Sequence, residues 1–222
     1  PTGSEDPYAL RRNALGIIQI FLDRGWQISL DSLVEEGLSL MGTKLKLEAE
    51  AIKNHVMDLF SQRYKSHLNA EGFPHDAIDC VMSTGLDSIV DIRAKVSAFS
   101  DLKKQPYFEP LAIAFRRVVS ILTEEATGEV DPGLLNESAE KKLFEAYMKV
   151  RDPVLQHIQN KEFDQALEKI AEIKPAVDGF FDEVMVMVED VALRDNRLHL
   201  LHQISGLFSG LADFSRIILK KG

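Results

Sequence analysis

The sequence has very little cysteine and no long apolar run. Its 222 residues include one cysteine, Cys80, which excludes an internal disulfide framework and a multi-cysteine metal site and fits a reducing compartment. No stretch approaches the ~20 uninterrupted apolar residues that a membrane helix requires. The first residues, Pro1 to Pro7, resemble neither a signal nor a transit peptide. We therefore expect a cytoplasmic protein, and the missing initiator methionine indicates a fragment of something longer.

Clusters of residues typical of catalytic or metal sites are also lacking. The thirteen glycines are scattered singly, so no phosphate-binding loop is indicated. His75-Asp76 matches the dipeptide of metal-dependent phosphohydrolases but stands almost alone, and Asp76 is better explained by its place at a helix N-terminus after Pro74. No pair of histidines has the zinc-protease spacing. The sequence predicts no catalytic residue, no metal site and no bound cofactor.

Positive charge is scarce overall but unevenly distributed. The 35 acidic and 26 basic residues give a net charge of −9, which argues mildly against a nucleic-acid partner. From Asp152 to Glu189 there are nine acidic and three basic residues, a net of −6, whereas from Asp190 to Gly222 there are three acidic and five basic, a net of +2. A nucleic-acid partner therefore has to be sought in local patches.

Several basic residues could form such a patch if the fold brings them together. Taken alone, charged residues on helices are usually solvated surface. The candidates on the second half of the chain are Arg116, Arg117, Lys141, Lys142, Lys149 and Arg151.

Apolar residues recur at helical spacing throughout, and no segment reads as a convincing strand. The run from Val184 to Val188 has strand-like composition but no second strand to pair with, so we expect it to be helix or the end of a helix. The pattern predicts an all-α helical bundle with two subdomains, residues 1–105 and 106–222, divided at Pro106. Helices are expected at 6–25, 31–40, 44–68, 74–82, 88–99 and 110–126, and from 138, 162, 175 and 192.

The run from Asp190 to Leu198 resembles the signature of the DALR anticodon-binding domain. Its surroundings resemble the C-terminal end of the beta subunit of bacterial tetrameric glycyl-tRNA synthetase. The segments that carry this resemblance occur in the family's order and extend over essentially the whole chain: 6–16, Gly72-Phe73-Pro74, Arg117-Val118 with Ile121-Leu122, Val130-Asp131-Pro132, 140–143, 180–187, Leu207-Phe208 and 211–215.

The resemblance implies a helical body region over residues 1–105 and a DALR-type anticodon-binding bundle over 106–222. It further implies that the chain recognises the anticodon region of glycine tRNA, as part of an enzyme that attaches glycine to this tRNA using ATP. The catalytic site, with ATP and glycine, would belong to the alpha subunit, a partner of the full enzyme. The tRNA-binding candidates are then Arg116, Arg117, Lys142, Lys149, Arg151, Arg194 and Arg197.

Arg194 and Arg197 fall on the apolar stripe of the last helix, where a guanidinium needs an oxygen partner. Both could pair with a carboxylate, for which Asp190, Asp182 and Glu183 are candidates, or could bind anticodon phosphates or bases. A structural role is favoured for Arg194, whereas Arg197 is evenly balanced between the two. An alternative function is a helical protein-interaction module without an RNA role of its own, which the acidic composition and the single Trp26 support.

Overall fold

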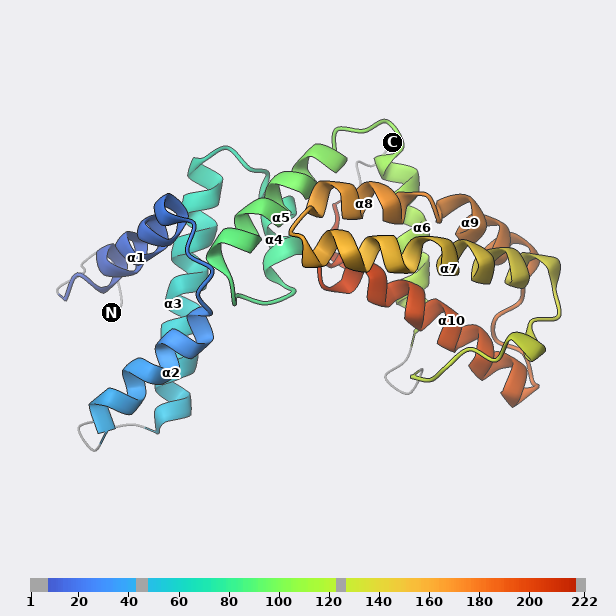
Figure 1. Ribbon diagram of the computed structural model, residues 1–222, viewed down its shortest axis with the longest axis horizontal. Helices are drawn as coiled ribbons and strands as arrows, with labels where there is room; N and C mark the ends of the chain where they lie inside the picture. Colours follow the sequence, from blue (N-terminus) through green and yellow to red (C-terminus); the bar gives the residue numbers. More distant parts are fainter. Residues whose placement is uncertain (1–7, 43–47, 123–126, 219–222) are drawn as a thin grey trace. The chain divides into compact units, whose positions relative to one another are not determined.

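The computed structural model describes residues 8–42, 48–122 and 127–218 (Figure 1). The regular structure in these ranges is entirely helical, which confirms the expected all-α class. The chain divides into two compact units, unit 1 (Pro1–Ser97) and unit 2 (Ala98–Gly222), and the division falls inside helix α5 (Ile89–Leu102), before the boundary expected at Pro106. A search of the described residues for a helix long and apolar enough to span a bilayer found none.

Unit 1 is built around a long helix, α3 (Ala49–Ala70), which packs against α1 (Leu10–Arg24), α2 (Leu30–Met41) and α4 (His75–Met82). Burial of apolar side chains from these helices holds the unit together. The buried Tyr64 of α3 donates its hydroxyl to the carbonyl of Ile89 at 2.5 Å and so ties α3 to the start of α5. The buried core side chains include Ile18, Phe21, Phe60, Tyr64, Leu68, Ile78 and Val81.

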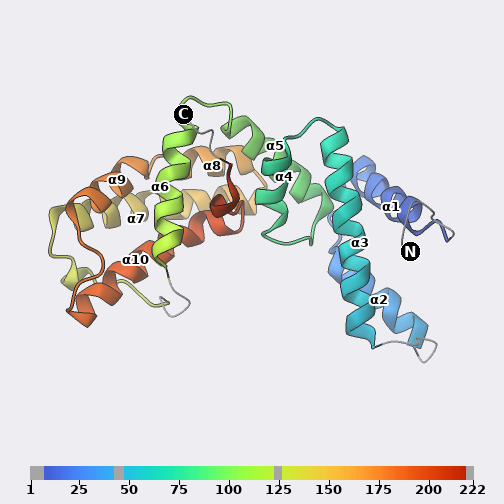
Figure 2. The ribbon, with the colours of Figure 1, turned by 180° about the vertical axis from the view of Figure 1, so that it is seen from behind.

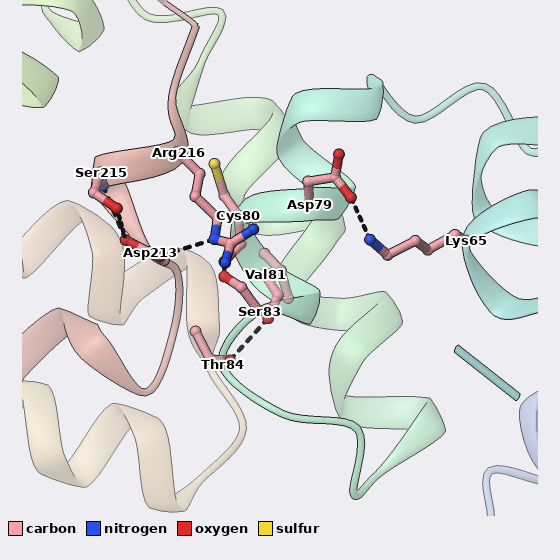
Figure 3. Close-up of polar contacts among 9 residues, drawn as sticks. All are labelled: Lys65, Asp79, Cys80, Val81, Ser83, Thr84, Asp213, Ser215 and Arg216. Atoms are coloured by element: carbon pink, nitrogen blue, oxygen red, sulfur yellow. Dashed lines mark hydrogen bonds and ion pairs between the residues drawn. The ribbon is translucent and has the colours of Figure 1, made fainter. Parts of the chain in front are cut away.

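Local contacts mark the ends of the unit 1 helices and join α3 to α4. Helix α1 ends at Gly25, whose φ of 63° lies in the left-handed region that glycine tolerates. After α4, the hydroxyl of Thr84 donates to the carbonyl of Val81 at 2.8 Å, and Lys65 of α3 pairs with Asp79 at 2.5 Å (Figure 3). The helix starts expected at Asp6-Pro7 and Lys44 lie outside the described residues.

Unit 2 consists of five helices, the end of α5 and two short 3₁₀ turns within its described residues. Helix α7 packs against α8, α9 and α10, while α6 packs against α9, α10 and η3 (Figures 1 and 2). The elements are α6 (Phe108–Ile121), η2 (Pro132–Leu134), α7 (Ser138–Gln159), α8 (Phe163–Ala171), α9 (Lys174–Glu183), α10 (Val191–Ser209) and η3 (Phe214–Arg216).

A cluster of phenylalanine rings forms part of the unit 2 core. Phe115 of α6 stacks on Phe208 of α10 with ring centroids 4.6 Å apart, and Phe214 of η3 meets both rings edge-on. Asp213 holds η3 in shape by accepting from the backbone N–H and hydroxyl of Ser215 (Figure 3). The chain after α10 is therefore folded back into the core.

One local prediction was wrong. Helix α9 ends at Glu183, so the run 184–188 is not helical but a link that is extended at Val184 and bends at 186–187, with Val184 and Val186 buried and Met185 and Met187 exposed. The alternation of burial explains its strand-like composition. At Asp131-Pro132 the chain forms the 3₁₀ turn η2, in which the Asp131 side chain accepts the N–H of Gly133 as an N-cap. Helix α6 ends at Ile121. Ala126, where its end was expected, lies outside the described residues.

Candidate nucleic-acid interface

Arg117 is an exposed cation that rests on an aromatic ring. Its guanidinium carbon lies 4.5 Å from the ring centroid of Phe181, on the neighbouring helix α9, and its side chain is 44% exposed. The nearest carboxylate oxygen, of Asp182, is 3.9 Å away, which is too long for a direct hydrogen bond. Since α6 and α9 pack together, the two helices hold this arginine in place without using its hydrogen-bond donors.

Arg116, the next residue on α6, is directed into the fold. It donates from Nη2 to the carbonyl of Ile217, just after η3, and its Nε is buried with no hydrogen-bond partner among the described residues. The guanidinium therefore fastens the end of the chain to α6, and only part of the side chain faces solvent.

The cations of α7 differ in their availability. Lys142 and Lys149 lie two turns apart on exposed positions, and within the described residues neither has an ion-pair or hydrogen-bond partner; the same is true of Lys141. Arg151 pairs with Asp152, its Nε 2.8 Å from the carboxylate. The hydrogen bond and the charge of Arg151 lower the pKa of Asp152. The two lysines are therefore better placed to contact an anion than Arg151.

Arg194 is only half-buried, contrary to expectation. Its side chain is 32% exposed, and its Nε lies 3.3 Å from the carboxylate of the adjacent Asp195 rather than from Asp190, Asp182 or Glu183. The physical reason is its place in the helix: no residue of α10 from Val191 to Asp195 is buried, and burial begins at Asn196. The favoured prediction of a buried ion pair for Arg194 is wrong.

Arg197 forms the buried pair instead. Its Nε donates to Oε1 of Glu140 on α7 at 2.5 Å, and its Nη1 donates to the carbonyl of Met185 in the extended link at 2.8 Å. The Arg197 and Glu140 side chains are 5% and 0% exposed. Glu140 also accepts the backbone N–H of Glu137 at 2.7 Å, which completes a capping box at the start of α7. Arg197 therefore has a structural role. The prediction that its carboxylate partner is Asp190, Asp182 or Glu183 was wrong.

Asn196 is a structural residue that the sequence reasoning missed. Its side-chain amide pairs with both backbone groups of Asp131, accepting from the N–H at 2.7 Å and donating to the carbonyl at 3.0 Å. The available signal was its position one turn before the buried Leu200 on the same helix face. Asn196 and Arg197 together anchor the segments around residues 131 and 185 to α10.

The seven candidates do not share one surface. Helix α7 lies in front in Figure 1 and helix α6 in front in Figure 2, so the two helices cover opposite sides of unit 2. Arg117 lies on α6, Lys142 and Lys149 lie on α7, and Arg194 lies in the first turn of α10, before its burial begins. Four candidates remain open to a ligand: Arg117, Lys142, Lys149 and Arg194.

Two family models match the chain. The model described as the glycyl-tRNA synthetase beta subunit matches residues 1–83, and the model of the DALR anticodon binding domain matches residues 111–212. The second match begins in α6 and ends just after α10, so it extends over the helices that carry all seven candidate cations.

Curated proteins named glycine–tRNA ligase beta subunit are similar over nearly all of the chain. The protein of Syntrophus aciditrophicus is 39% identical over 218 residues, which are 98% of this chain and 32% of the relative. That of Geotalea daltonii is 41% identical over 217 residues (98% and 31%), and that of Geotalea uraniireducens 43% over 221 residues (98% and 32%). The chain thus spans about a third of the length of these relatives.

Proposed function

Because the chain belongs to the glycyl-tRNA synthetase beta subunit family, we propose that its unit 2 binds the anticodon region of glycine tRNA. The observation that carries this proposal is the DALR match over residues 111–212, which includes the exposed Lys142 and Lys149, whose ammonium groups have no protein partner within the described residues. A domain that binds an anticodon needs cations, hydrogen-bond donors and stacking surfaces rather than a nucleophile.

The wider activity follows from the same family. The chain acts as part of an enzyme that attaches glycine to its tRNA in the cytoplasm, with ATP and glycine bound by the alpha subunit as the partner. Within unit 2, RNA contacts come from Arg117, Lys142, Lys149 and Arg194. Arg197 and Arg116 act within the protein, because each donates to an oxygen of a segment far away in the chain. Arg151 is held by the adjacent Asp152 at 2.8 Å, whereas Arg194 lies 3.3 Å from its neighbour Asp195.

The test is a salt-dependent titration of the 222-residue chain with glycine tRNA, alongside the same tRNA altered only in its anticodon. We expect tighter binding of the native anticodon, and a log affinity that falls linearly with log salt because phosphates release counterions. Equal affinity for the two tRNAs at every salt concentration would contradict anticodon recognition by this chain.

A second candidate function is a protein-interaction module. The observation that favours it is the exposure of large apolar side chains in unit 1, where Leu40 is 80% and Trp26 48% exposed. This function predicts binding of a protein partner, such as the alpha subunit, that depends little on salt and is lost in Leu40→Glu. The same titration separates the two functions, since only the first predicts a steep salt dependence with tRNA.

A further inference from the structure

The guanidinium of Arg117 is held in place but not hydrogen-bonded. Phe181 supports one of its faces, and the α6–α9 packing fixes both backbones. Within the described residues its side chain donates no hydrogen bond, whereas Arg116, Arg151 and Arg194 each donate to a protein oxygen. The guanidinium group of an arginine carries five N–H donors. The outer face and the edge of Arg117 are therefore available to a ligand.

The charge around Arg117 disfavours a phosphate on that face. The carboxylate of Asp182 lies 3.9 Å from the guanidinium, on a side chain that is 72% exposed, whereas Asp178 on the same helix is paired with Lys174. The Asp182 carboxylate repels a phosphate but not a neutral nucleobase. A planar cation lying on an aromatic ring suits stacking by a flat, uncharged ring, because unpaired bases stack on arginine planes as well as on aromatic side chains.

We propose that Arg117 and Phe181 form a stacking site for one unpaired base of an RNA loop, with the guanidinium lying between the base and the phenylalanine ring. This inference rests on the proposed function and adds to it the chemical class of the group that is bound. Phe181 acts as the positioning residue, since it touches the guanidinium rather than the base. Asp182 limits the affinity, because its charge opposes the approach of the RNA backbone.

The first part of the test separates charge from shape. Arg117→Lys keeps the positive charge but removes the planar guanidinium group. Phe181→Leu keeps an apolar side chain but removes the aromatic ring. We expect each variant to bind glycine tRNA roughly tenfold more weakly than the wild type, as for loss of one stacked base, with an unchanged salt slope. Arg93→Lys, the same exchange at an exposed arginine of unit 1 outside the DALR match, is the matched control and should bind like the wild type. Asp182→Asn should bind more tightly.

The second part identifies the base. Each nucleotide of the anticodon loop is replaced in turn by an abasic one, and the affinity is measured with the wild type and with Phe181→Leu. If one base stacks on the site, its removal should weaken wild-type binding about tenfold but leave the binding of Phe181→Leu nearly unchanged, because both changes break the same stack. Additive losses at every loop position would overturn the proposal.

The outcomes separate this inference from the function on which it rests. No anticodon preference in the wild type would overturn both. A clear preference that Arg117→Lys and Phe181→Leu fully retain would overturn the stacking site alone. Thermal melts show whether a variant is folded, and Phe181→Tyr, which restores a ring, should regain wild-type affinity. If Phe181→Leu does not fold, the abasic tRNAs are titrated with Arg117→Lys instead. The abasic change at the stacked base should then leave the affinity of Arg117→Lys nearly unchanged.

Discussion

Arg197 of α10 and Glu140 of α7 form an ion pair inside unit 2, with 2.5 Å between Nε and Oε1 and almost no exposed surface on either side chain. The pair joins three parts of the chain, because Arg197 also holds the carbonyl of Met185 and Glu140 caps the start of α7. A charge in such a place is tolerated only while its partner remains.

Arg197→Ala is expected to destabilise unit 2 by about 3–5 kcal/mol, because it leaves the Glu140 carboxylate buried and unpaired. Urea denaturation followed by circular dichroism measures the change. The matched control is Arg194→Ala on the same helix, which should change stability by less than about 0.5 kcal/mol, since Arg194 is half-buried and its ion pair lies at the surface. Equal effects of the two substitutions would contradict this assignment.

Asn196→Ala should cost about 1–3 kcal/mol, because it removes both hydrogen bonds to the Asp131 backbone and empties a buried position. Hydrogen exchange should quicken at the N–H of Asp131. Asp195→Ala is the neighbouring control, and we expect it to leave the exchange of this amide unchanged. Unaltered protection of Asp131 in Asn196→Ala would show that the amide pair does not hold this segment.

Tyr64 should make the stability of unit 1 sensitive to alkaline pH. Burial raises the pKa of its hydroxyl above the ordinary value of 10.0. Above pH 10 the unfolded chain therefore loses a proton that the folded chain keeps, so the free energy of unfolding falls as pH rises. Tyr64→Phe should be about 0.5–1.5 kcal/mol less stable at neutral pH, through loss of the hydrogen bond to Ile89, and should decline less above pH 10.

The single tryptophan, Trp26, lies in unit 1 beside Phe21, with ring centroids 6.2 Å apart. Its fluorescence during urea unfolding thus reports on this unit at each pH. Wild-type and Tyr64→Phe curves that fall in parallel between pH 9 and 11 would mean that Tyr64 does not titrate as its burial requires.

Arg117→Ala is expected to melt like the wild type, because the side chain is exposed and makes no hydrogen bond among the described residues. Its affinity for glycine tRNA should fall roughly tenfold, as for the loss of one stacked base, while its salt slope should change little, because the side chain contacts a base rather than a phosphate. Lys142→Ala and Lys149→Ala test the opposite side of unit 2. An unchanged affinity in Arg117→Ala would remove α6 from the RNA-binding surface.

The sequence predicted the helices well because their boundaries are local. Gly25 ends α1 and Glu162 precedes α8, as the cap and glycine signals indicated. The run 184–188 was misread because it is held by a contact distant in the sequence: the hydrogen bond to Met185 comes from Arg197, twelve residues further along the chain. Periodicity placed both Arg194 and Arg197 near the apolar stripe, but it could not show where along α10 burial begins.

The site itself was less accessible to sequence reasoning. Glu140 is 57 residues from Arg197, so the carboxylates nearest in the chain were preferred as partners. The contact between Arg117 and Phe181 depends on the packing of α6 against α9, which no local pattern specifies. Charge alone indicated seven cations, whereas side-chain partners separate those turned to solvent from those that act within the protein.

The position of Arg197 has a consequence for mutational surveys of unit 2. A screen that scores only tRNA binding would rank Arg197 among the strongest hits, because a chain with an unpaired buried charge unfolds and then binds nothing. Arg117, which we propose contacts the RNA directly, would score lower. In this bundle the larger binding defect would therefore belong to the residue farther from the ligand, so the abundance of each variant must be measured beside its affinity.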